Sequence, residues 1–276
     1  MNSGVLRWIL LGGAFWGGGP LAAWLTEGIR DPRGGYWASL LYSDDPVRAV
    51  LQAVGAFAVA LVFAVAGARW FSVRSGLFAA GLVLVWPAWT VGSMTGIIRG
   101  ARETPVFRLL VLEGALVASM CALVAFAVAR AAAIGRGADE PSAGEERDGG
   151  KRALACGAAL VGGVVGAFVV ARTALPGQAV AAGVCAGLLG ALGGGLIERR
   201  LSAALVLPVV AVLACAGPAL GAVVNGTDPV RDLYAGTLTP LARLTPLHWA
   251  AGVLLGVPIG SSWVAGLGKP AEAGKA

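Results

Sequence analysis

The sequence predicts an all-α integral membrane protein with about eight transmembrane helices, arranged as four related helical hairpins. Hydrophobic residues make up 57% of the 276 positions and charged residues only 13%, whereas a soluble domain carries roughly 25% charge. Apolar runs of about 20 residues, the length that crosses roughly 30 Å of hydrocarbon, recur along the chain. The 43 glycines are typical of helices that approach one another closely in lipid.

The apolar runs define the spans in order. The first begins beside Arg7 and could be taken for a signal peptide, but its apolar run is longer than a signal core and no clean cleavage site follows it, so we expect an uncleaved helix. The predicted spans are residues 5–26, 48–68, 76–98, 106–129, 153–171, 177–197, 202–225 and 247–265.

One long segment is too polar to lie in the membrane. Residues 130–152 are rich in charged residues, Gly, Ala and Ser, a composition typical of a flexible linker. We expect a cytoplasmic linker here, between a first membrane block of four helices, residues 1–129, and a second, residues 153–268. A short tail, residues 269–276, follows.

Proline positions suggest that the hairpins are related. Each even-numbered span begins at a proline, where the missing N–H costs nothing, and in three of the four an Asp or Thr precedes it as a predicted N-cap. These prolines are Pro46, Pro105, Pro176 and Pro246, and the predicted caps are Asp45, Thr104 and Thr245.

The odd-numbered spans support the repeat. Pro20, Pro87 and Pro218 lie within three of them, where proline kinks a helix. The segments that start at Gly19 and Gly217 both open with Gly-Pro and share Gly, Arg, Tyr and Leu at the same four later positions. Chance similarity among sequences rich in Gly, Ala and Pro is the alternative explanation.

Charge predicts the orientation. With eight spans, both termini share a side with loops 68–75, 130–152 and 198–201, and this side holds the larger share of the 21 Lys and Arg residues. Basic loops stay in the cytoplasm, so we expect cytoplasmic termini. A composition dominated by Ala, Gly, Val and Arg suggests a bacterial cytoplasmic (inner) membrane.

Glu113 and Gln52 are the candidate site residues. Glu113 lies eight positions after Pro105, about 12 Å along the helix at 1.5 Å per residue, a depth where ionisable side chains are rare and usually functional. Gln52 lies at a similar depth after Pro46. We expect the two to converge at a repeat interface, where repeat-built transporters place their sites. Packing hydrogen bonds between helices are the structural alternative for both.

Other site classes are not indicated. The four cysteines lie in apolar segments without C-x-x-C spacing, and His248 is the only histidine, so we expect no metal, no cofactor and no catalytic role. The net charge of +6 is a topology signal rather than a nucleic-acid footprint. Gly19 and Pro20 predict either an unwound helix segment that binds a ligand or a close-packing kink.

These observations favour a small-solute or ion transporter, permease-like, with its site near Glu113. The alternative is a non-catalytic membrane scaffold or an accessory subunit of a larger membrane complex. The expected partners are the lipid bilayer and, for that alternative, other membrane subunits. An enzyme acting on lipid ranks behind both, because only the charged loops support it.

Overall fold

The computed structural model describes residues 3–35, 38–101, 105–135 and 149–267, and every regular element in these ranges is helical. Eight helices within these ranges are long and apolar enough to cross a membrane. The chain is therefore a multi-pass membrane protein, as predicted.

The first span is a continuous helix made of α1 (Ser3–Gly13), a π-helical turn η1 (Ala14–Gly18) and α2 (Gly19–Thr26). The seventh span is divided into α9 (Ala203–Ala211) and α10 (Leu213–Val224). The remaining spans are α3 (Pro46–Trp70), α4 (Val73–Thr90), α6 (Val106–Gly135), α7 (Gly149–Val170), α8 (Pro176–Ile197) and α12 (Pro246–Leu267). Three short elements lie between spans: α5 (Met94–Gly100), α11 (Pro229–Ala235) and a 3-10 turn η2 (Pro240–Arg243).

The third predicted span was wrong at its C-terminal end. We expected residues 76–98, but α4 ends at Thr90 and Val91 is extended. Ser93 then caps a separate helix, α5, because its side chain accepts a hydrogen bond from the Gly96 amide at 3.4 Å. The capping side chain of Ser93 thus starts a new helix although the sequence stays largely apolar after Thr90.

The predicted linker is shorter than expected. Helix α6 continues to Gly135 and α7 begins at Gly149, so both ends of the predicted segment 130–152 are helical. Its centre, residues 136–148, and the predicted tail, 269–276, lie outside the described residues. The other predicted spans agree with the helices to within a few residues.

The proline and cap predictions are largely confirmed. Pro46, Pro176 and Pro246 are first helical residues. The Asp45 side chain accepts from the Arg48 amide at 3.0 Å, and the Thr245 hydroxyl accepts from the His248 amide at 3.5 Å. Helix α6 starts one residue after Pro105, and the predicted cap Thr104 lies outside the described residues.

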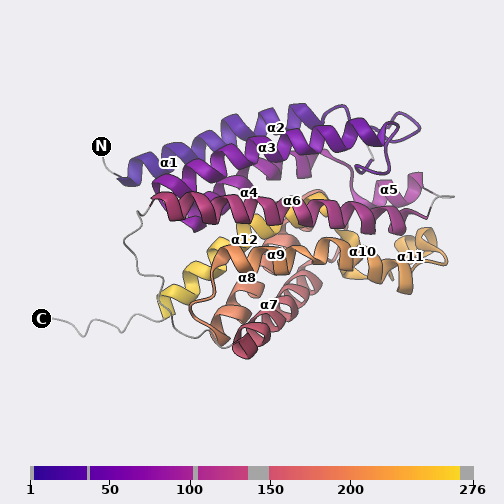
Figure 1. The fold of residues 1–276 in the computed structure, drawn as a ribbon. Coiled ribbons are helices and arrows are strands. Elements are labelled where there is room, and N and C mark those ends of the chain that lie inside the picture. The colour runs from indigo at the N-terminus through magenta and orange to yellow at the C-terminus, as the bar shows by residue number, and fades with distance from the viewer. Residues whose placement is uncertain (1–2, 36–37, 102–104, 136–148, 268–276) are drawn as a thin grey trace, which may run out of the picture.

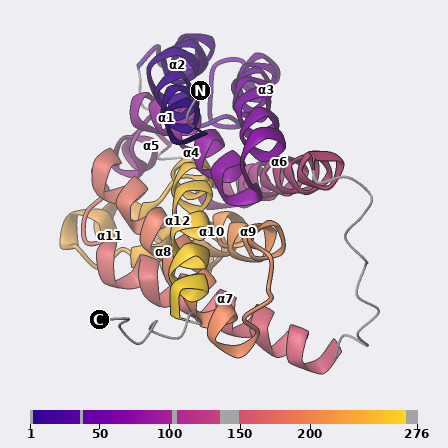
Figure 2. The same cartoon turned by 90° about the vertical axis from the view of Figure 1, so that its left-hand side faces the viewer.

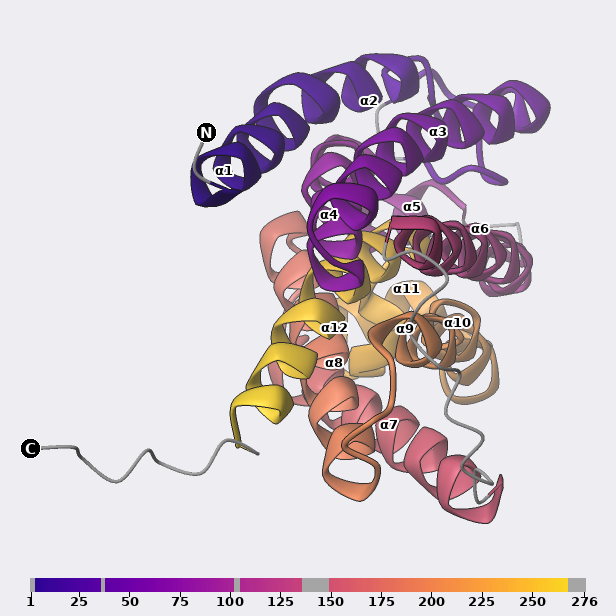
Figure 3. The same ribbon diagram turned by 60° about the vertical axis from the view of Figure 1, so that its left-hand side comes forward.

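The helices form a bundle with α4 and α12 at its centre. Figures 1 and 3 show α1, α2 and α3 along one side and α7 along the opposite side, with α4, α6 and α12 between them. Helix α12 packs on α8 and α4, while α6 packs on α3, α9 and α10. The third helix of each block therefore contacts the fourth helix of the other block. The four-hairpin repeat itself stays a prediction.

The connections between the spans lie at two opposite ends of the bundle. The start of α1 and the end of α12 lie at one end, and α5 and α11 lie at the other (Figure 1). We call the second end, which carries the described residues of segments 27–35, 38–45, 91–101, 171–175 and 225–245, the loop face.

The interior is packed tightly by small residues. A Cβ built on Gly252 would lie 2.5 Å from Gly183 Cα, and one on Gly256 would lie 2.0 Å from the Val184 carbonyl oxygen. Helices α8 and α12 thus touch through their backbones, which is the packing that small residues permit in lipid.

Cys121, in the middle of α6, tests this tight packing. Its side chain is fully buried, so a variant that keeps only this cysteine should resist a small membrane-impermeant maleimide in membranes opened on both sides. Labelling is measured by mass spectrometry, and unfolding in detergent should restore it. Labelling of the folded protein would instead reveal a hydrated path to α6.

Candidate functional site

A pocket at the loop face contains one of the two predicted site residues, Gln52. The N-cap at Asp45 starts α3, so Arg48 and Gln52 lie one helical turn apart on the same face. Across from them, the chain leaves α2 through Glu27 and Gly28. We call this the Gln52 pocket, of about 580 Å³, lined by Trp24, Leu25, Glu27, Gly28, Arg30, Asp44, Arg48 and Gln52.

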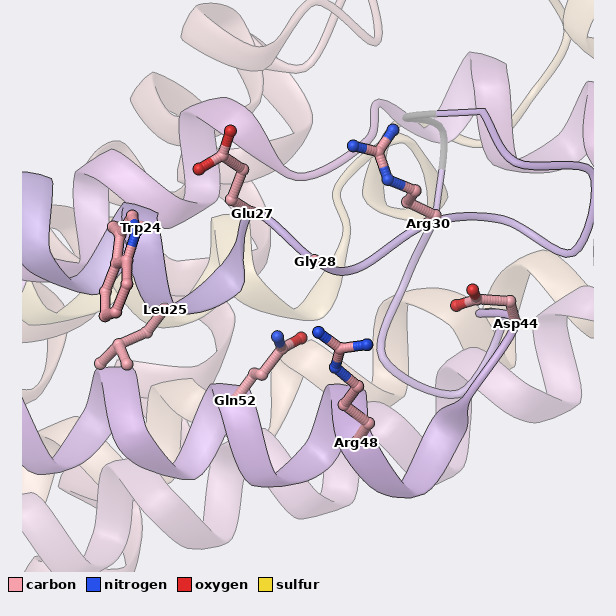
Figure 4. A pocket seen from close by; sticks show the side chains of 8 residues that line it. All are labelled: Trp24, Leu25, Glu27, Gly28, Arg30, Asp44, Arg48 and Gln52. Carbon is pink, nitrogen blue, oxygen red and sulfur yellow. The ribbon is translucent and has the colours of Figure 1, made fainter.

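The lining charges are balanced. Glu27 and Asp44 are acidic and Arg30 and Arg48 are basic. Figure 4 shows Arg48 and Gln52 rising from α3 toward the segment that carries Gly28, with their side-chain ends next to each other. A site with both signs of charge and one amide suits a polar occupant rather than an apolar one.

Two local features hold the walls together. The Asp44 amide donates to the Arg30 carbonyl at 2.9 Å, which brings these two lining residues to the same edge. A Cβ on Gly28 would lie 2.7 Å from Gln52 Nε2 and 3.4 Å from the Arg48 guanidinium. Glycine at position 28 therefore leaves the space that the Gln52 amide occupies.

The Gln52 side chain has an oxygen without a hydrogen-bond partner in the part of the chain that the structure describes. Its Oε1 atom is buried and has no hydrogen-bond partner among the described residues. A buried acceptor without a donor costs roughly 1–3 kcal/mol, so a donor that reaches this atom would be stabilising.

Glu113, the other predicted site residue, does not line this pocket. Its side chain is only 1% exposed, and its Oε2 accepts a hydrogen bond from the Leu41 amide at 3.1 Å. The Ser39 side chain and the Leu40 backbone also hydrogen-bond to the carboxyl group. The predicted convergence with Gln52 is therefore indirect: Glu113 binds the loop whose next residues reach the pocket at Asp44.

The loop that Glu113 binds is unusual because it is buried without being helical. Residues 38–40 are fully buried, and Tyr42 and Ser43 are nearly so. Buried backbone outside helices needs protein groups to satisfy its amides, and the Glu113 carboxyl supplies acceptors for them. Burial and the negative charge of Asp31 raise the pKa of the Tyr42 hydroxyl in this loop.

The predicted helix-break residues lie inside helices. Gly19 and Pro20 follow the π-helical turn η1 and belong to the continuous first span. A Cβ on Gly19 would lie 2.2 Å from Trp86 Cδ1, so this glycine makes a close packing contact with α4.

The other two predicted kink residues are also buried. Pro87 lies in the last turn of α4, and Pro218 lies within α10. The break in the seventh span falls at Val212, between α9 and α10, where the Val212 amide donates to the Pro208 carbonyl at 3.3 Å.

His248 lies in the first turn of α12, at the predicted helix start. It is fully buried, and its Nδ1 lies 2.7 Å from the Thr245 hydroxyl. No group of three or more His, Cys, Asp or Glu residues in the described ranges is arranged to hold a metal ion.

Sequence reasoning missed a second polar region of the loop face, where Arg99, Arg172 and Arg243 line one pocket. These arginines come from three separate segments, and no motif or spacing links them. Only the packing of α5, η2 and the α7–α8 turn brings them together.

No known protein family matches this chain, and neither the curated proteins nor the solved structures contain a significant match. Its function therefore has to be inferred from the fold and from the pockets at the loop face.

Proposed function

We propose that the protein is a small-solute transporter, permease-like, whose solute binds in the Gln52 pocket. The observation that carries this proposal is the buried Gln52 Oε1 without a partner among the described residues, in a pocket of about 580 Å³ that reaches the loop face. A solute with an N–H or O–H group would satisfy this acceptor and remove its cost.

The charges of the pocket favour a zwitterionic solute. The carboxylates of Glu27 and Asp44 and the guanidinium of Arg48 line it, so a solute with one cationic and one anionic group meets a charge opposite to each. A solute with a single charge would leave the lining charges of its own sign without an opposite partner.

Glu113 contributes through the loop rather than by touching the solute. It binds the Leu41 amide, and the exposed Asp44 follows three residues later in the same loop. Within this proposal Glu113 is a positioning residue, and replacing it with Leu should abolish flux by releasing the pocket wall that carries Asp44.

The proposed location is a bacterial cytoplasmic membrane, with the starts of α1 and α7 on the cytoplasmic side. The support is the larger share of Lys and Arg in the sequence segments that share a side with both termini. The Gln52 pocket then opens toward the outside, where a solute would first meet the protein.

Uptake into proteoliposomes that contain the full-length protein tests the proposal. Radiolabelled glycine, taurine and glycine betaine serve as zwitterionic probes, choline as the cation and acetate as the anion. We expect zwitterion uptake above protein-free liposomes. Gln52→Ala should reduce it by about tenfold, because the variant removes one hydrogen-bonding group worth roughly 1.4 kcal/mol.

Leu51→Ala is the matched control. Leu51 lies on the same turn of α3, is 66% exposed and does not line the pocket, so this variant should transport normally. Equal losses in both variants, or no uptake of any probe, would contradict the proposal.

The scaffold alternative is favoured by one observation, the backbone-to-backbone packing of α8 on α12 through Gly183, Gly252 and Gly256. Such contacts leave little room for the helices to move past one another. A scaffold predicts no uptake of any probe and a partner membrane protein that co-purifies with the full chain.

A further inference from the structure

A second pocket at the loop face gathers positive charge. It has a volume of about 330 Å³, and its lining includes Arg99, Arg172, Arg243, Thr95, Thr173 and Tyr234. We call it the arginine pocket. Its described lining contains no Asp or Glu, in contrast to the balanced Gln52 pocket.

The arginine pocket lies where the two membrane blocks meet. Arg99 belongs to α5, Arg172 follows the end of α7, and Arg243 ends η2. Helix α5 contacts both α11 and η2, and η2 contacts α7. Figures 1 and 2 show α5 and α11 close to each other at the loop end of the bundle.

Arg243 is a fixed cation that has no donor left for a ligand. Its Nε and Nη2 donate to the Leu238 carbonyl at 3.0 and 2.8 Å, and Nη2 also donates to the Gly236 carbonyl at 3.0 Å. Its Nη1 donates to the carbonyls of Ala171, at 3.4 Å, and Arg172. Burial and the neighbouring charge of Arg172 lower the pKa of this guanidinium.

The other two arginines keep donors toward the pocket. Arg99 lies over the Tyr234 ring at 5.1 Å from its centroid, a contact that uses the face of the guanidinium and leaves its edge available. Arg172 donates through Nε to the Val169 carbonyl at 3.1 Å, which leaves its terminal amino groups. Among the described residues, no carboxylate lines the pocket beside these three side chains.

We propose that the arginine pocket binds a phosphate group, either the headgroup of an anionic phospholipid or free inorganic phosphate. Three cations that share a pocket without a carboxylate repel one another, and a multivalent anion relieves that repulsion. Guanidinium edges match phosphate oxygens in bidentate geometry. Arg172 comes two residues after the end of a membrane span, which is the depth of lipid headgroups.

A bound phosphate would join the two blocks. Arg99 is carried by the first block, and Arg172 and Arg243 by the second, so an anion between them links α5 to the α7–α8 turn and η2. This proposal does not rest on the Gln52 pocket or on transport.

The test measures thermal unfolding of the delipidated full-length protein in a neutral detergent. One arm adds inorganic phosphate, compared with chloride at equal ionic strength. The other adds phosphatidylglycerol, compared with phosphatidylcholine. Stabilisation by phosphatidylglycerol alone assigns a lipid headgroup, stabilisation by phosphate alone assigns the free anion, and stabilisation by both assigns the phosphate group itself. All three results support the site.

Variants decide whether the effect comes from this pocket. Arg99→Gln and Arg172→Gln should each weaken the apparent affinity of the stabilising probe by about tenfold, because each removes a charge-assisted contact. Arg231→Gln is the control, since Arg231 is exposed on α11 and does not line the pocket. The proposal is overturned if neither phosphate nor phosphatidylglycerol stabilises more than its comparison, or if the control loses as much affinity as the pocket variants.

Discussion

Replacing Glu113 with leucine should release the buried loop between α2 and α3 and destabilise the protein strongly. The Leu41 amide loses its acceptor, and the Ser39 and Leu40 groups lose theirs. At roughly 1–3 kcal/mol for each orphaned buried donor, the expected cost is about 4 kcal/mol. The measurement is the thermal or denaturant midpoint of the purified protein, together with protease sensitivity of the loop.

Glu113→Gln is the informative partner variant. Glutamine keeps one side-chain oxygen of the same reach, so it should retain the Leu41 bond and lose only about 1–2 kcal/mol. If leucine and glutamine were equally harmless to stability, Glu113 would not be holding the loop. A direct role for its charge in the site would then be the better interpretation.

Gly256→Ala should lower the stability of the protein strongly, because it adds a methyl group at the interface between α8 and α12. Its Cβ would lie 2.0 Å from the Val184 carbonyl oxygen, and backbone cannot rotate away as a side chain can. We expect a loss of about 3 kcal/mol, the upper part of the usual range for overpacking, measured as a lower thermal midpoint in detergent.

Gly157→Ala, in the membrane-spanning helix α7, should instead raise the stability of the protein. No atom lies within 4 Å of a Cβ at Gly157, so the substitution adds helix propensity without a clash and should stabilise the protein by up to about 1 kcal/mol. If Gly256→Ala were equally well tolerated, α8 and α12 would not be packed as closely as described.

The span pattern could be read from the sequence because it depends on local properties. Apolar length determines which segments cross the membrane, and a proline after a capping side chain marks where a helix begins, as at Asp45 and Pro46. The error at the end of α4 arose because residues 91–98 are largely apolar although Ser93 starts a new helix there. Composition alone does not reveal such a break.

The candidate site was predicted only in part. Glu113 and Gln52 stand out because polar side chains are rare within the spans, and both carry buried polar atoms. The way in which Glu113 and Gln52 are connected was not predictable. Glu113 accepts hydrogen bonds from residues 39–41, and no pattern of side chains in the sequence indicates that this loop is buried. The Gln52 pocket and the arginine pocket draw on residues from separate loops, so no motif could indicate them.

The sequence by itself determined a multi-pass helical membrane protein and, through capping and proline chemistry, most of its helix ends. The tertiary structure decided which loops meet at the loop face, what Glu113 binds and where positive charge gathers. The physical reason is that burial in lipid acts on each segment separately. Contacts between loops depend instead on how glycine-lined helices pack, and that is a property of the whole bundle.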